Sequence, residues 1–283
     1  MVMFFLATAG LFHPFSPHEG SWWVIEPGIT IGLLGLTLLY LLAVGPLRRR
    51  LGGPAQLDRR HAAFFLSAIL IMFVSLQGPL HELSDYYSFS AHMLQHLLVT
   101  LIMPPLLLKG IPAWLIDPVI RLPYLFPVAR FITSPFIAFT LFNVVFSLWH
   151  SPGFYQRALG QPAVHSLEHM LFMSTAILTW WPIFSPTSLL PRLNDPLQML
   201  YLFAQSLIPT VLGAIITFAD IVLYPYYAAA PRVIGLSPLD DQQAAGLLMW
   251  LGGATIVLLV LTHRFFRWME LDAEDGREAP RAV

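Results

Sequence analysis

The chain has 283 residues, of which 57% are hydrophobic and only 11% are charged, whereas soluble domains carry roughly 25% charged residues. This composition excludes a water-soluble globule and indicates an integral membrane protein. The formal net charge of -1 argues against nucleic acid as a partner, and the absence of cysteine excludes disulfides, iron-sulfur clusters and thiolate metal sites.

Apolar runs of near-spanning length recur along the chain and predict an all-α, polytopic bundle with about seven transmembrane helices. We expect residues 1–21 to form an N-terminal outer segment that is not cleaved as a signal peptide. Residues 22–268 are expected to form the transmembrane domain, and residues 269–283 a charged, disordered cytoplasmic tail. The expected spans are 22–44, 61–77, 91–108, 131–149, 165–184, 197–218 and 244–263.

The distribution of basic residues predicts the orientation, because cytoplasmic segments retain Lys and Arg. With the N-terminus outside and the C-terminus inside, every Lys and Arg except Arg157 and Arg232 falls in an inner segment. We therefore expect a multi-pass protein of the cell's inner (plasma) membrane, surrounded by lipid.

Two connections and one proline pair predict further features of the fold. Residues 110–130 are too apolar for a free loop and too rich in proline to span, so they predict a short helix lying in the membrane interface. A second short helix is expected around residues 154–159 of an outer loop. The pair Pro104-Pro105 is expected to break the third span.

Two histidine pairs open apolar runs at the same outer level. His92 and His96 are four residues apart, so both rings lie on one face of a helix, and His165 and His169 repeat the spacing. Ionisable groups inside a span are costly and usually face the bundle interior. Imidazole binds copper, zinc, iron and nickel, so the pairs could supply up to four nitrogens to one ion. The alternative is that each ring only hydrogen-bonds a backbone carbonyl.

The predicted topology places further polar residues near these pairs. His81 follows the second span and His150 ends the fourth, both on the outer side, so we expect them to assist as metal ligands. Ligating histidines usually donate their other ring N–H to a neighbouring acceptor. The candidates for that supporting role are Glu168, Asp85 and Gln95.

The connection before the last span is richer in polar residues than helix capping requires. Ser237 or Asp240 can cap the helix, and Asp241 is part of the surplus. We expect Asp241 to close the histidine site from above. His13 and His18 also lie on the outer side, and no role is assigned to them.

An ordered series of motifs contains these residues. They are His92-Met-Leu-Gln-His96 running into Met103-Pro-Pro-Leu-Leu, Trp149-His-Ser-Pro152, His165-Ser-Leu-Glu-His169 followed by Trp180-Trp-Pro182, Leu200-Tyr-Leu-Phe203, and Gly235-Leu-Ser-Pro-Leu-Asp-Asp-Gln-Gln-Ala-Ala-Gly-Leu-Leu-Met-Trp250. In these motifs, over roughly residues 20–268, the chain resembles the CtaG-type cytochrome c oxidase assembly factors. The resemblance implies a non-enzymatic role in maturing a haem-copper oxidase, with an oxidase subunit as partner and copper handled at the outer face.

Three functions stay open at this point. The first is a copper-handling assembly protein, although an all-histidine site selects Cu(I) poorly because imidazole is a borderline ligand. The second is a haem-binding electron carrier with histidines as axial ligands. The third is a di-iron membrane enzyme, but such enzymes also use boxes with adjacent histidines on the cytoplasmic side, and this chain has no adjacent histidine pair.

Overall fold

The computed structural model describes residues 22–56 and 58–278, and every regular element in these ranges is helical. The predicted all-α fold is therefore confirmed. The predicted outer segment 1–21, with His13 and His18, lies outside the described residues. The elements are α2 (Pro27–Val44), α3 (Arg59–Leu76), α4 (Gly78–Tyr86), α5 (Phe89–Leu97), the π-helical turn η1 (Leu98–Ile102), α6 (Met103–Gly110), α7 (Ala113–Ile120), α8 (Leu125–Ile132), α9 (Pro135–Trp149), α10 (Pro152–Gly160), α11 (Pro162–Phe184), α12 (Asp195–Thr217), α13 (Pro225–Ala229), α14 (Pro238–Leu247), the π-helical turn η2 (Leu248–Gly252) and α15 (Gly253–Glu278).

The long helices make this a multi-pass membrane protein. In the described ranges, five continuous helical segments are long and apolar enough to cross a membrane, and α8 with α9 would form a sixth across a 68° bend. The remaining predicted span corresponds to α11, which has 23 residues. Its mean hydropathy is lowered by His165, Glu168 and His169, so length and composition alone give five or six spans where the sequence predicts about seven.

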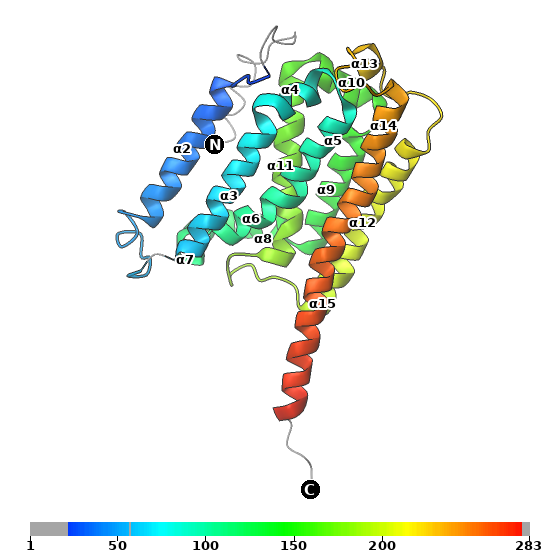
Figure 1. Cartoon of the computed structure of the whole chain (residues 1–283). Coiled ribbons are helices and arrows are strands. Elements are labelled where there is room, and N and C mark those ends of the chain that lie inside the picture. Colours follow the sequence, from blue (N-terminus) through cyan, green and yellow to red (C-terminus); the bar gives the residue numbers. More distant parts are fainter. Residues whose placement is uncertain (1–21, 57, 279–283) are drawn as a thin grey trace.

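The helices stand side by side with short helices at both ends (Figure 1). We call the end that holds α4, α10 and α13 the α4 end, and the end that holds α7, α8 and the last turns of α15 the α7 end. Helix α11 packs against α6 and α9, while α12 packs against α14 and α15. The helices α7, α8 and α10 occupy the connections in which short helices were expected.

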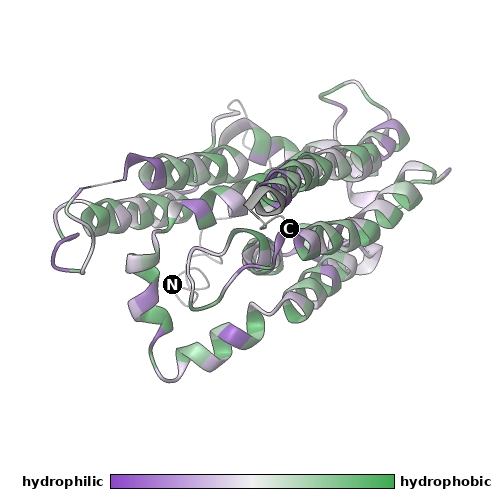
Figure 2. Ribbon diagram, turned by 90° about the horizontal axis from the view of Figure 1, so that it is seen from below, coloured by the Kyte–Doolittle hydropathy of each residue, from purple (hydrophilic) through white to green (hydrophobic). Residues whose placement is uncertain are grey.

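The outward faces of the spanning helices are apolar. Leu34 on α2, Leu200 on α12 and Leu259 on α15 are 65%, 63% and 67% exposed. Figure 2 shows apolar residues along most of the helices, while hydrophilic residues gather in connections and near the C-terminus. Large apolar side chains with this exposure are stable in hydrocarbon and costly in water, so lipid covers these faces.

Basic residues separate between the two ends. Arg157 on α10 and Arg232 after α13 belong to the α4 end, and the other described Lys and Arg residues belong to segments near the α7 end. This separation agrees with the assignment of inner and outer segments from the sequence. That the α7 end faces the cytoplasm stays a prediction.

The proline pair does not break the third span, contrary to expectation. Residues Phe89–Gly110 form one continuous spanning segment, in which η1 lies between α5 and α6. Pro104 and Pro105 follow η1 directly, and their missing N–H groups leave carbonyl groups of that turn without the usual helical partner. The wider π-helical turn before them absorbs the mismatch, as π-bulges do in long helices.

The predicted disordered tail is helical over much of its length. Helix α15 continues to Glu278, and residues 279–283 lie outside the described residues. Extending a helix that is already formed needs no new nucleation. Residues 269–278 include Glu, Leu and Ala, which favour helix, so the spanning helix extends beyond the bundle.

Two glycines set the contact between α12 and α14. A Cβ on Gly246 of α14 would lie 2.6 Å from Thr217 N and 2.8 Å from Gly213 O of α12. Because both neighbours are backbone atoms, Gly246→Ala would have to push the helices apart. We expect it to lower the free energy of unfolding by about 1–3 kcal/mol, measured by SDS-induced unfolding of the purified protein.

The control is Gly35→Ala on α2, because a Cβ there would meet nothing within 4 Å. This substitution should leave stability unchanged or raise it slightly, since alanine favours helix over glycine. If Gly246→Ala unfolded at the same SDS concentration as Gly35→Ala, the result would contradict the close contact between α12 and α14.

Candidate metal centre

The six histidines singled out in the sequence are all buried at the α4 end. They come from α4, α5, α11 and the residue that ends α9. None exposes more than 7% of its surface; the exposed fractions are 7% for His81, 0% for His92, 5% for His96, 5% for His150, 4% for His165 and 7% for His169. Helices that start and end near one membrane surface therefore place these rings at one depth inside the bundle.

The two histidine pairs, one on α5 and the other on α11, lie against each other. Ring centroids are 4.2 Å apart within the His92 and His96 pair and 4.6 Å apart within the His165 and His169 pair. Between the pairs, His92 lies 6.1 Å from both His165 and His169, and His96 lies 5.7 Å from His169. The pairs thus form one cluster facing the interior, and their role as metal ligands stays a prediction.

The other two histidines flank this cluster. The His81 ring lies 6.5 Å from that of His169, and the His150 ring lies 6.3 Å from that of His96. Nδ1 of His150 is 2.7 Å from the carbonyl oxygen of Phe146, the contact expected of an N–H donor on that nitrogen. That bond leaves Nε2 of His150 available to a ligand.

Each histidine pair has a carboxylate beside it. Ligand atoms of His92, His96 and Glu168 lie within 4.8 Å of one another, and so do those of Asp85, His165 and His169. The sequence predicts Glu168 and Asp85 as acceptors for ring N–H groups from outside the site. The structure places an oxygen of each within 4.8 Å of two histidine nitrogens, so these carboxylates can support the histidines or bind a metal beside them, and their predicted role stays a prediction.

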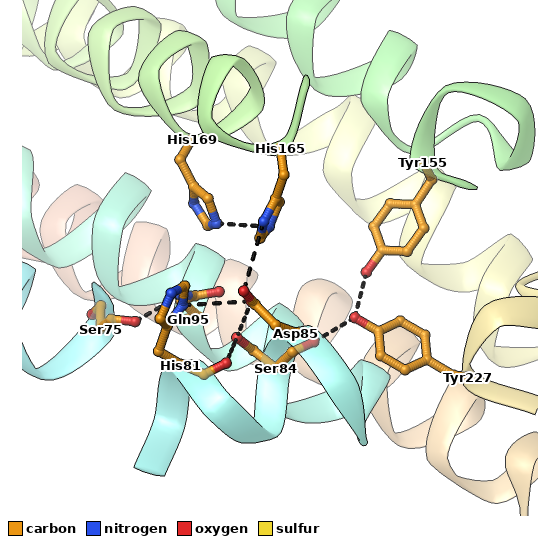
Figure 3. A network of polar contacts seen from close by, with 9 residues as sticks. All are labelled: Ser75, His81, Ser84, Asp85, Gln95, Tyr155, His165, His169 and Tyr227. Atoms are coloured by element: carbon orange, nitrogen blue, oxygen red, sulfur yellow. Dashed lines mark hydrogen bonds and ion pairs between the residues drawn. The ribbon is translucent and has the colours of Figure 1, made fainter. Parts of the chain in front are cut away.

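Asp85 joins several of these groups, as Figure 3 shows. Its Oδ1 lies 3.4 Å from Nδ1 of His81 and its Oδ2 lies 3.6 Å from Nδ1 of His165. Gln95, the other predicted supporting residue, donates from Nε2 to the Ser75 carbonyl at 2.7 Å and approaches Nδ1 of His81 at 3.2 Å. These contacts fix the position of His81.

Several buried polar atoms in the cluster have no hydrogen-bond partner among the residues that the structure describes. These atoms are both ring nitrogens of His92, both ring nitrogens of His96 and both carboxylate oxygens of Glu168. An unsatisfied buried polar group costs about 1–3 kcal/mol, and native proteins contain few of them. A bound cation would take one nitrogen from each ring and the carboxylate of Glu168, so the donor set fits a metal ion.

Asp241 is 1% exposed and holds the start of α5, and its predicted role of closing the histidine site from above stays a prediction. Its Oδ1 accepts hydrogen bonds from Ser88 Oγ at 2.9 Å, Ser90 N at 3.1 Å and Ser90 Oγ at 2.5 Å, and its Oδ2 accepts one from Phe89 N at 2.7 Å. The α5 N–H groups attract this carboxylate, so Asp241 acts on the histidines by positioning their helix. Ser237 caps α14, as expected.

Two tyrosines beside the site were not found by sequence reasoning. Tyr155 on α10 and Tyr227 on α13 have hydroxyl oxygens 3.0 Å apart, and Tyr227 donates to the Ser84 carbonyl at 2.5 Å (Figure 3). The Tyr155 ring lies 5.2 Å from that of His92. Burial raises the pKa of both tyrosines well above the usual value, so both stay neutral. They lie in connections, where no periodicity marks them.

Comparison with known proteins identifies the family. No curated protein and no solved structure matches the chain. The family model described as cytochrome c oxidase caa3 assembly factor (Caa3_CtaG) matches residues 38–270, a range that contains all six buried histidines and both carboxylates. Since this match spans most of the chain, the protein belongs to the family of cytochrome c oxidase caa3 assembly factors.

Proposed function

We propose that this protein assists the assembly of a haem-copper cytochrome c oxidase by binding copper in its histidine cluster and passing it to an oxidase subunit. In this proposal the α4 end faces the outer side of the inner membrane, and the protein binds its cargo without catalysing a reaction. The observation that carries the proposal is the set of unpartnered atoms on His92, His96 and Glu168 in a fully buried cluster.

The composition of the cluster suits a transition metal rather than calcium or magnesium. Imidazole nitrogens outnumber carboxylates, and hard cations prefer oxygen ligands. Four imidazoles and two carboxylates could supply two neighbouring ligand groups, one from His92, His96 and Glu168 and the other from Asp85, His165 and His169. The protein would hold copper by these side chains and release it where the oxidase binds.

One observation favours a second candidate, a non-haem iron protein. Two histidines with one carboxylate is the ligand set typical of non-haem iron sites, and this set occurs in both ligand groups. Haem bound axially by two histidines is the remaining alternative, and a Soret band in the purified protein would reveal it.

Metal analysis of the purified protein tests both candidates. The protein would be produced in cells supplied with copper and iron, purified without chelators, and analysed by mass spectrometry for each metal per chain. Copper at one or two ions per chain supports the proposal, and iron in that amount supports the second candidate. A protein that binds neither after loading with Cu(I), Cu(II) or Fe(II) would rule out both candidates.

Replacing Glu168 by glutamine tests the carboxylate as a ligand. Glu168→Gln has the same shape but removes the negative charge beside His92 and His96, and we expect at least about tenfold weaker copper binding, as for other changes around metal ligands. Competition with a copper chelator of known affinity measures it. The matched control is Asp117→Asn at the α7 end, which should bind as the wild type does. Equal affinity of both variants would place Glu168 outside the metal site.

A further inference from the structure

A second polar site lies at the α7 end, away from the histidine cluster. A cavity of about 590 Å³ lies among α3, α6, α15 and the connection after α11, a volume within the range of pockets that hold small molecules. The polar and charged residues of its wall include His61, Lys109, Ser185, Arg192, Arg264 and Arg267. The proposed copper function uses none of them.

The charge of this cavity is strongly positive. Four Lys and Arg residues line it, and no Asp or Glu is among its lining residues in the described part of the chain. The nearby carboxylate of Asp195 lies 3.8 Å from Arg264 Nη1 and 3.9 Å from Arg267 Nε. One carboxylate shared by two guanidinium groups leaves an excess of positive charge in the cavity, which favours an anionic ligand.

Arg264 supplies an independent sign of a ligand. Its exposed fraction is only 3%, and its Nη2 donates weakly to the Ile183 carbonyl at 3.4 Å. Its Nε has no hydrogen-bond partner among the described residues. Arg264 lines the cavity, and because a buried guanidinium with an unused donor is costly, a bound anion would offset part of that cost.

An aromatic ring holds two of the cations beside the cavity without neutralising them. Lys109 Nζ lies 4.6 Å from the centre of the Phe184 ring, and Arg264 Cζ lies 5.0 Å from the same ring. Cation–π contacts of this kind orient a charge while leaving its donors free for another partner. The two groups are therefore positioned in advance for one multivalent anion.

We propose that this basic cavity binds a phosphate-bearing anion, supplied either as the headgroup of an anionic phospholipid or as a free phosphate compound. Arg and Lys donors match phosphate oxygens, and basic pockets between helices at the cytoplasmic side of a membrane bind anionic headgroups. The wall also includes Leu259 and Val260. Leu259 is 67% exposed on a face that lipid covers, so an acyl chain could lie beside a bound headgroup.

Lipid and phosphate binding to the purified full-length protein test this proposal. Native mass spectrometry would compare retention of phosphatidylglycerol with that of phosphatidylcholine, and thermal unfolding in detergent would be followed with and without inorganic phosphate. The variant is Arg192→Gln with Arg267→Gln. The control is Arg121→Gln with Arg130→Gln, which removes the same charge from the same end outside the cavity.

We expect the cavity variant to bind the favoured anion at least about tenfold more weakly, because two charge-assisted contacts are lost, and the control to bind as the wild type does. Loss of preferential phosphatidylglycerol retention identifies a lipid, and loss of phosphate stabilisation without a lipid preference identifies a free phosphate compound. Arg192→Lys with Arg267→Lys should restore binding in either case. Equal retention and equal phosphate response in wild type, variant and control would overturn the proposal.

We expect anion binding in the basic cavity to be independent of the histidine cluster. The cavity variant should bind copper as the wild type does, because its two arginines lie at the opposite end of the bundle, and retained copper also shows that the variant is folded. Arg192 is exposed, so the single variant Arg192→Gln, which leaves the Asp195 contacts intact, gives a second measurement if the double variant is unstable.

Discussion

The double variant His92→Ala with His96→Ala is expected to lose copper binding at the ligand group that includes Glu168, with affinity there at least about 100-fold below wild type, the upper end of the effects of changes around metal ligands. These residues supply adjacent imidazoles, 4.2 Å apart between ring centroids, to the ligand group that includes Glu168. Their four ring nitrogens have no partner among the described residues. Removing them leaves one carboxylate, which binds copper poorly alone. Chelator competition measures the affinity.

The consequence for the oxidase is measured in cells that lack the wild-type protein. Cells carrying the double variant should contain oxidase with reduced copper and correspondingly reduced oxygen consumption. The matched control is His61→Ala with His263→Ala, two histidines of the α7 end that line the basic cavity, which should keep copper binding. Normal copper in the oxidase of cells with the His92 and His96 variant would contradict copper delivery by this cluster.

A second prediction for the same variant concerns the stability of the metal-free protein. Without metal, the buried rings cost free energy because their nitrogens are unsatisfied, so their removal should destabilise the metal-free protein less than an ordinary cavity of that size would. Copper should raise the melting temperature of the wild type, because a ligand that binds only the folded state stabilises it. The variant should lose this increase.

The variant Asp241→Ala is expected to lower the free energy of unfolding by about 1–3 kcal/mol or more, as leaving buried hydrogen-bond donors unsatisfied does. The carboxylate accepts four hydrogen bonds from residues 88–90 at the start of α5. Alanine would leave these donors buried and unsatisfied. Because α5 carries His92 and His96, copper affinity should fall as well. SDS-induced unfolding and chelator competition measure the two effects.

Two further variants test whether the loss of stability comes from the hydrogen bonds of Asp241. Asp240→Ala removes a neighbouring acid whose carboxylate contacts Ser237 Oγ in the same helix, and it should cost about 0.3–1 kcal/mol. Asp241→Asn keeps an oxygen for Ser88 and Ser90 but presents an NH₂ group to Phe89 N, so its stability should lie between wild type and Asp241→Ala. Equal stability of the Asp240 and Asp241 alanine variants would exclude Asp241 as the link between α14 and α5.

Local properties of the sequence predicted much of the site. The lengths of the apolar runs predicted the spanning helices, and the four-residue spacing predicted that each histidine pair lies on one helix face. Both predictions depend only on residues that are near each other along the chain. The shared depth of the pairs followed from counting spans. A short helix within residues 110–130 and the helix α10 were also predictable, because apolar residues interrupted by prolines cannot span, but the division of the first region into α7 and α8 was not.

The structure decided what depends on how helices rotate and pack. Spacing alone could not tell that Glu168 and Asp85 each lie beside two histidine nitrogens, because that requires the rotation of α11 relative to α4 and α5. Asp241 looked like surplus polarity before a span, since its partners are more than 150 positions away. The same limit applies to Tyr155 and Tyr227, which lie in connections.

The sequence by itself therefore determined an all-helical membrane protein with paired imidazoles at one level, because burial in lipid constrains hydrophobicity and helix length residue by residue. Only the tertiary structure decided which polar groups share a site at each end. Lys109, Arg192 and Arg264 line one cavity although they come from two helices and a connection. Such groupings arise from helix packing between distant segments, which no local pattern in the chain records.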